Sequence, residues 1–400
     1  MKADTTLYLT AAEAAAELGI SRASLYAYVS RGKLRSVARS GSRARLYVAE
    51  DVRRLRQASA LDPGATTAQA LTAPAVLDSA ITLISDQTLY YRGRDALRLA
   101  EAQSLEAVAS LIWGATEDPF SEAETRVKGK PLPAGFKANE LTVIDRTLLA
   151  LAWQAPRDPF IHNLTPQGLA RTGARVLELL IAAVLQTAAV AEPAHVQIAR
   201  AHGLGAQHAE WVRSALVICA DHELNPSTLA VRVVAGTRAS LYRAVAAGLA
   251  ALSGPEHGGM TERADALLLE LAASRDPAQA VRDRLRRGEG LPGFGHPLYP
   301  AGDPRARFLL GRMLGKSSTH GSAATTLLAS VVRAAREYSG LDPNLDFALS
   351  SLAWVLRLPP SSALGIFAIG RTVGWVGHAL EQYQSGQRIR PRARYVGEHP

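Results

Sequence analysis

The sequence predicts a mainly α-helical protein, with a large and a small helical domain behind a short N-terminal winged helix-turn-helix. From about Leu77 onward, apolar residues recur at intervals of three and four, for example in residues 105–112 and 176–185. Alternating β-branched residues are scarce there. By contrast, the first 57 residues carry eleven Lys and Arg against five acidic residues, a charge of +6, while the whole chain carries +9. A basic head on a nearly neutral body indicates an anionic partner for the head.

Composition excludes several classes of protein. With 400 residues, 48% hydrophobic and 20% charged, the chain suits two or three folded domains rather than a disordered tail. One cysteine, Cys219, excludes a disulfide framework and a cysteine-rich metal site. No other metal site is visible in the sequence, so we expect no metal. The N-terminus lacks the apolar core of a signal peptide, and residues 179–191 fall short of the ~20 residues that cross a bilayer. We expect a soluble, cytoplasmic protein.

The head begins with two predicted helices. Thr10 and Glu13 have the spacing of a capping box, which starts an Ala-rich helix that runs through Leu18. A Gly-Ile pair breaks it, and Ser21 can cap a second helix over residues 22–30. This short helix pair is typical of a helix-turn-helix.

The rest of the head is predicted as a β-ribbon and a linker. Residues 33–47 are basic and carry a Gly-Ser turn at 41–42 between β-compatible ends. A short polar helix is expected from Ala49. Residues 59–75 mix Ala, Thr, Pro and Gly without periodicity, as a linker does, so the predicted domain bounds are 1–58, 59–75 and 76–400.

Three histidines and one aspartate in the body lie among helix breakers. They are His222, His257, His296 and Asp346. Glycine beside a histidine allows a close approach of the backbone to a ligand. Each residue alone is weak evidence for a functional site. A histidine beside glycine is often a turn residue, and an aspartate that follows a proline and an asparagine is often a helix cap.

Taken together and in order, these segments resemble the citrate synthase family. The matching motifs are DHELNPST at 221–228, GPEHGG at 254–259, GFGHPLY at 293–299, DPRA at 303–306 and PNLDF at 343–347. The resemblance covers roughly residues 76–397. It implies an almost wholly helical fold, with a small lobe over roughly 220–345 and a site in the cleft between the lobes.

The resemblance also implies the reaction. It is the Claisen-type condensation of acetyl-CoA with oxaloacetate and hydrolysis of the citryl thioester to citrate and CoA, a step of the tricarboxylic acid cycle, with no cofactor. The alternative is a 2-methylcitrate synthase that uses propionyl-CoA, since one methylene is worth only ~1–3 kcal/mol of discrimination.

By the same resemblance, Asp346 is the base and His257 donates a hydrogen bond to the thioester carbonyl. His296 polarises the oxaloacetate carbonyl, and His222 helps to hold oxaloacetate. The oxaloacetate carboxylates are expected to bind three arginines, Arg305, Arg371 and Arg390. The last is supplied by the partner subunit in the family, which implies a homodimer. The residues expected near CoA are Gly293 and Gly295.

Three residues depart from the family pattern beside catalytic histidines: Glu256, Met260 and Pro297. Each flanks a catalytic histidine without replacing it. We therefore expect them to bear on the choice of acyl-CoA and on the rate, rather than on the type of reaction.

The head is similar to winged helix-turn-helix domains of the MerR or excisionase type. In that reading Arg22, Ser24 and Tyr28 face a major groove. The wing arginines are Arg35, Arg39, Arg43 and Arg45. A helix-turn-helix can instead serve as a protein-contact module. The sequence thus leaves two hypotheses: an enzyme with an accessory head, or a DNA-binding regulator whose body senses substrate without turnover.

Overall fold

The computed structural model describes most of the chain in two compact units. One unit holds Met1–Asp78 and Arg390–Pro400, and the other holds Ser79–Ile389. The described residues are 8–18, 20, 25–26, 28–29, 34–38, 45–49, 51–52, 77–121, 130–133, 135–315, 323–391 and 395–398.

The first unit pairs a short helix with a small sheet. Its strands β1 (Tyr8–Thr10), β3 (Arg45–Val48) and β2 (Ser36–Ala38) form an antiparallel sheet in the order β1-β3-β2, as the predicted ribbon requires. Helix α1 (Ala11–Leu18) follows β1 directly. The turn at 41–42 and most of the predicted second helix lie outside the described residues.

The capping box predicted at the start of α1 is confirmed. The Thr10 N–H donates to Glu13 Oε2 at 2.8 Å, and the Glu13 N–H donates to Thr10 Oγ1 at 3.3 Å. Behind α1 lies a small apolar core, which consists of Ala14, Ala15, Leu25, Leu34, Tyr47 and Val52.

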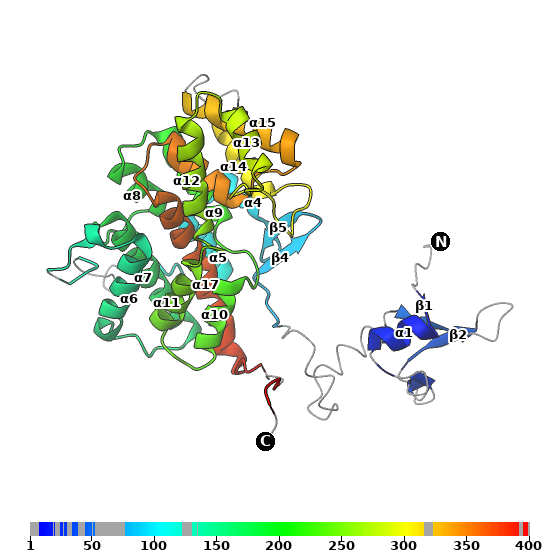
Figure 1. The fold of residues 1–400 in the computed structure, drawn as a ribbon. Helices are drawn as coiled ribbons and strands as arrows, with labels where there is room; N and C mark the ends of the chain where they lie inside the picture. Colours follow the sequence, from blue (N-terminus) through cyan, green and yellow to red (C-terminus); the bar gives the residue numbers. More distant parts are fainter. Residues whose placement is uncertain are drawn as a thin grey trace. The chain divides into compact units, whose positions relative to one another are not determined.

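The second unit opens with a small antiparallel sheet and is otherwise helical (Figure 1). The sheet is formed by β4 (Thr82–Ser85), β5 (Thr88–Tyr91) and β6 (Arg94–Asp95). Its helices are α4 (Ala96–Ala102), α5 (Leu105–Trp113), η2 (Ala138–Glu140), α6 (Val143–Gln154), η3 (Ala155–Arg157), α7 (Pro166–Leu185), α8 (Ala194–Ala201), α9 (Ala206–Ile218), α10 (Pro226–Ala235), α11 (Leu241–Leu252), α12 (Met260–Ala273), α13 (Pro277–Arg286), α14 (Pro304–Leu314), α15 (Ala323–Ser339), α16 (Leu345–Val355) and α17 (Ser362–Ser385).

Helix α17 is the central helix of this unit. It packs against α5, α7, α9, α10 and α11, and Figure 1 shows it running through the middle of the bundle. Glycines on α17 allow this close packing: a Cβ at Gly370 would lie 2.6 Å from the Leu216 carbonyl oxygen. By length and composition α17 could span a membrane, but its apolar window is entirely buried, as in a core helix.

Two groups of helices pack closely within the rest of this unit. Helices α6, α7, α10 and α11 pack together and against α17. Helices α12–α16 pack among themselves through the pairs α12–α16, α13–α15 and α14–α16. The predicted fold class, a mainly α protein, is confirmed, whereas the predicted domain and lobe bounds stay predictions.

Candidate active site

The residues predicted for catalysis come from loops and helix starts of the second unit. His222 follows α9, His257 lies between α11 and α12, and His296 lies between α13 and α14. Arg305 and Asp346 lie in the first turns of α14 and α16, and Arg371 lies in the middle of α17. Charge interactions join all six side chains in one cluster.

The rings of His222 and His296 lie against each other, beside Tyr299. Their ring centroids lie 5.4 Å apart with the rings edge to face, and His222 Nε2 lies 2.9 Å from the Tyr299 hydroxyl. Burial, with Arg305 next in importance, holds the pKa of His222 well below its usual range. The His222 imidazole is therefore neutral at neutral pH, when it can take part in hydrogen bonds without adding charge.

His296 has a defined tautomer. Its Nδ1 accepts the backbone N–H of Leu298 at 3.1 Å, so in the neutral ring the proton is on Nε2. Burial, followed by the charge of Arg305, lowers the pKa of His296. His296 is thus a neutral imidazole whose Nε2–H can donate to a ligand.

His257 is held by a hydroxyl. Its Nε2 lies 2.8 Å from Ser227 Oγ, which also accepts the Trp375 Nε1–H at 3.2 Å and lies 2.7 Å from Asn225 Oδ1. Burial, followed by Arg371, lowers the pKa of His257 to about 4. Because the Ser227 hydroxyl donates to Asn225 Oδ1, it accepts from His257 Nε2, which carries the ring proton in this arrangement. Donation from Nδ1 requires the Ser227 hydroxyl to turn from Asn225 to His257 Nε2.

Asp346 is a buried acid at the start of α16. Asn344 caps this helix and accepts the Asp346 N–H at 3.0 Å. Burial raises the pKa of Asp346 to about 7, although Arg305 and Arg371 oppose the shift. Among the described residues, none hydrogen-bonds the buried Asp346 Oδ1. This carboxyl group can therefore exchange a proton near neutral pH.

Each of the two buried arginines is held by hydrogen bonds at one edge of its guanidinium group. Arg305 donates from Nε and Nη2 to the buried carboxylate of Asp303, at 3.0 and 2.7 Å. Arg371 donates from Nε to the carbonyl oxygen of Cys219 at 2.8 Å. Cys219 itself is fully buried, and burial raises its thiol pKa to about 12. These anchors fix both guanidinium groups within the cluster.

Arg390 is exposed and belongs to the other compact unit, so its role in a partner subunit's site stays a prediction.

The two glycines predicted near CoA join two site loops. Gly293 has φ +84°, and a Cβ there would lie 2.8 Å from Phe347 Cβ. The Asn344 N–H donates to the Gly293 carbonyl at 2.8 Å, and Asn344 Nδ2 donates to the Gly295 carbonyl at 2.9 Å. Glycine thus allows the loop of His296 to lie against the helix of Asp346, while closeness to CoA stays a prediction.

Sequence reasoning missed three residues of the site: Ser227, Tyr299 and Asp303. Each lies inside a motif that the sequence displays, within two to five residues of a residue that was chosen. Their positions in those motifs were the available signal. Of the departures, Glu256 and Pro297 are exposed and Met260 is half-buried.

The head residues predicted to bind DNA are described only in part. Arg22, Ser24, Arg39 and Arg43 lie outside the described residues. Tyr28 is half-buried against the head core, whereas the neighbouring Tyr26 is 54% exposed. Arg35 pairs with Asp51 at 2.8 Å, and Arg45 is exposed.

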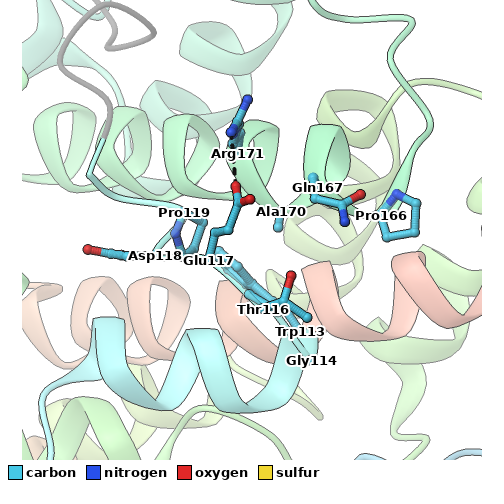
Figure 2. Close-up of a pocket in the computed structure, with 11 residues that line it drawn as sticks. Trp113, Gly114, Thr116, Glu117, Asp118, Pro119, Pro166, Gln167, Ala170 and Arg171 are labelled. Atoms are coloured by element: carbon cyan, nitrogen blue, oxygen red, sulfur yellow. Dashed lines mark hydrogen bonds and ion pairs between the residues drawn. The ribbon is translucent and has the colours of Figure 1, made fainter.

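A separate surface pocket lies between the end of α5 and the start of α7 (Figure 2). Trp113, Pro119 and Gln167 line it, and an ion pair of 3.2 Å joins Arg171 to Glu117 at its rim. It contains none of the predicted site residues. Among the described residues, no group of three or more His, Cys, Asp and Glu side chains could hold a metal ion.

A buried acid that titrates near neutral pH, histidines held neutral and two anchored guanidinium groups define an enzyme site in a helical fold. The sequence model for the citrate synthase C-terminal domain matches residues 70–392, and one for a helix-turn-helix domain matches residues 8–59. The chain belongs to the citrate synthase family, a family of enzymes that condense an acyl-CoA with oxaloacetate.

Three known proteins illustrate the similarity. A citrate synthase of Haloferax volcanii is 40% identical over 48% of this chain, and the match spans 51% of that protein. Citrate synthase 2 of Bacillus subtilis is 29% identical, over 80% of this chain and 93% of its own. The crystal structure of citrate synthase from Thermotoga maritima is 26% identical, with a TM-score of 0.66, over 81% of this chain and 94% of that one.

Proposed function

We propose that this chain condenses an acyl-CoA with oxaloacetate and hydrolyses the product thioester to a tricarboxylate and CoA. The observation that carries the proposal is the state of Asp346. Its carboxyl group is buried and has a pKa of about 7. A base that removes a proton from a weak carbon acid works best when its pKa lies near the working pH.

The cluster supports the following steps. Asp346 takes a proton from the α-carbon of the acyl-CoA, while His257 donates to the thioester carbonyl oxygen on which negative charge develops. The new carbanion attacks the oxaloacetate carbonyl carbon. The electron pair of that carbonyl moves to its oxygen, which takes a proton from His296 Nε2, and water then cleaves the thioester. The Leu298 N–H at 3.1 Å from His296 Nδ1 supports this tautomer.

The arginines and His222 are proposed to bind oxaloacetate. Each guanidinium group can form a bidentate pair with a carboxylate. Arg305 and Arg371 are anchored by Asp303 and the Cys219 carbonyl, which limits the loss of side-chain entropy on binding. Arg390 is proposed to reach the site of a second copy. The reaction requires neither a metal nor a cofactor. We assign the protein to the cytoplasm.

A homodimer follows from the proposed role of Arg390. Leu229 and Val233, one turn apart on α10, are 41% and 39% exposed. Apolar side chains spaced four residues apart on a helix form one face, which suits burial against a second copy. Sedimentation or light scattering of the full chain measures the oligomeric state, and a monomer under assay conditions would exclude a role for Arg390 in trans.

The acyl donor is proposed to be acetyl-CoA, with propionyl-CoA as the alternative that would make the chain a 2-methylcitrate synthase. The test is release of free CoA by the full-length protein with oxaloacetate and each thioester in parallel. Asp346→Asn, which keeps the shape of the side chain, serves as the control. Turnover that this variant lacks would support the proposal, and the faster thioester identifies the donor. Binding of oxaloacetate without turnover would favour a sensor.

A second function, binding of DNA by the head, is favoured by the exposed Arg45 and Tyr26 together with the helix-turn-helix match. Contacts to phosphates release counterions, so binding should weaken steeply as salt rises. A mobility shift with duplex DNA tests this on the full chain. Arg45→Glu should weaken the shift, whereas Arg98→Glu, an exposed change on α4, should not. No shift of the wild-type chain at low salt would favour a protein-contact role.

A further inference from the structure

The C-terminal end of α9 leads directly into His222 and is held by other elements. The last carbonyl groups of a helix have no partner within it. Here the Tyr91 hydroxyl lies 3.2 Å from the carbonyl oxygens of both Val217 and Ile218, and 3.3 Å from that of Asp221. The Gly374 N–H donates to the Ala220 carbonyl at 2.9 Å. Strand β5 and helix α17 therefore fix the backbone just before His222.

The Asp221 carboxylate holds the backbone on the other side of His222. It is fully buried, and its Oδ2 accepts the Thr82 hydroxyl at 2.5 Å and the Glu223 N–H at 3.1 Å. His378 Nε2 lies 3.2 Å from the same oxygen. Glu223 has φ +57°, a left-handed conformation that costs energy in a residue with a side chain. The hydrogen bond from its N–H to Asp221 stabilises this turn.

We propose that Tyr91, Thr82, Asp221 and His378 form a positioning network that fixes His222 and Arg371 for oxaloacetate. None of the four is assigned contact with the substrate. The inference rests on the proposed function, because it concerns the oxaloacetate end of that same site. It assigns to the small sheet at the start of the second unit a role in substrate affinity.

The network reaches both oxaloacetate-binding groups through the backbone. Cys219, whose carbonyl oxygen anchors Arg371 Nε, lies within the segment that Tyr91 and Gly374 hold. His222 is flanked by Asp221 and Glu223, which the carboxylate joins. Hydrogen bonds weaken steeply with small changes in distance and angle, so movement of this segment lowers affinity for oxaloacetate.

Tyr91→Phe tests the inference with the smallest change, because it removes only the hydroxyl. The matched control is Tyr90→Phe, since successive strand residues face opposite sides of the sheet. We expect Tyr91→Phe to raise the KM for oxaloacetate about fivefold, which corresponds to about 1 kcal/mol, with kcat changed less than twofold. The control should match the wild type. Calorimetric titration with oxaloacetate alone should give the same ratio.

Thr82→Val is the second variant, since it removes the hydroxyl that donates to Asp221 and keeps the shape of the side chain. Thermal unfolding of each variant identifies loss of the fold. If the Tyr91→Phe and Thr82→Val proteins are folded and bind oxaloacetate as tightly as the wild type, this inference is overturned and the proposed function is not. A wild-type chain that binds no oxaloacetate would overturn the proposed function and the inference together. Equal falls in kcat and in affinity for oxaloacetate would indicate a general structural role for these residues and would also overturn the inference.

Discussion

The burial of Asp346 predicts a conflict between stability and catalysis. Its pKa is raised from 3.8 to about 7 in the folded protein. The folded state therefore binds this proton more tightly than the unfolded chain does. Ionising Asp346 weakens the fold, and the cost grows as the pH rises from about 4 to about 7. Asp346→Asn, which carries no charge, should be free of that cost.

The size of the effect follows from the shift. Each pKa unit corresponds to about 1.4 kcal/mol, so the full cost above pH 7 is about 4 kcal/mol. At about pH 5 the acid is mostly protonated in the folded state, and the cost is roughly 2 kcal/mol. The advantage of Asp346→Asn over the wild type should therefore grow by between about 2 and 3 kcal/mol from about pH 5 to about pH 8.

Denaturant unfolding of both proteins across this pH range measures the prediction. Other groups that titrate are present in both, so the difference between the two free energies of unfolding isolates Asp346. The His257 shift has the opposite sign, because a lowered pKa removes stability as the pH falls, and it cancels in the difference. A difference that stays constant from about pH 5 to about pH 8 would refute the buried-acid argument. The variant should also lose turnover.

Three further predictions concern single side chains. His257→Ala should lower kcat about 10²- to 10³-fold with little change in oxaloacetate affinity, measured by steady-state kinetics and titration, because its donor acts on charge that forms in the transition state. Arg371→Lys should raise the Kd of oxaloacetate about 10- to 100-fold by calorimetry, and an unchanged Kd would remove it from the site. Gly293→Ala, which meets Phe347, should lower the free energy of unfolding by more than about 1 kcal/mol, whereas Gly311→Ala, in open space on α14, should not.

Local sequence signals predicted much of the fold. The capping box at Thr10 starts α1, and the β-compatible ends of the basic stretch pair as β2 and β3. Periodic apolar residues predicted the helical body, since each helix must bury one face. The small β4-β5-β6 sheet was not foreseen, because its strands are two to four residues long and give little periodic signal.

The site was predictable where a motif carried it and not where tertiary packing made it. His222, His257, His296 and Asp346 could be named because their motifs, in this order, resemble those of the citrate synthase family. The anchor of Arg371 could not, because the carbonyl of Cys219 is 152 residues from Arg371. No spacing in the sequence encodes such a contact. In the head, Arg35 was predicted as a wing arginine, and its ion pair with Asp51, 16 residues away, was not foreseen.

Because Cys219 is buried, it should not interfere with the labelling of a cysteine introduced at the surface. It is the only cysteine of the chain, and a fully buried thiol with a raised pKa reacts slowly with alkylating reagents. An engineered surface cysteine could therefore carry a fluorophore without prior removal of the native thiol. In the unlabelled protein, the rate at which Cys219 is modified would report how often the helix end beside His222 opens to solvent.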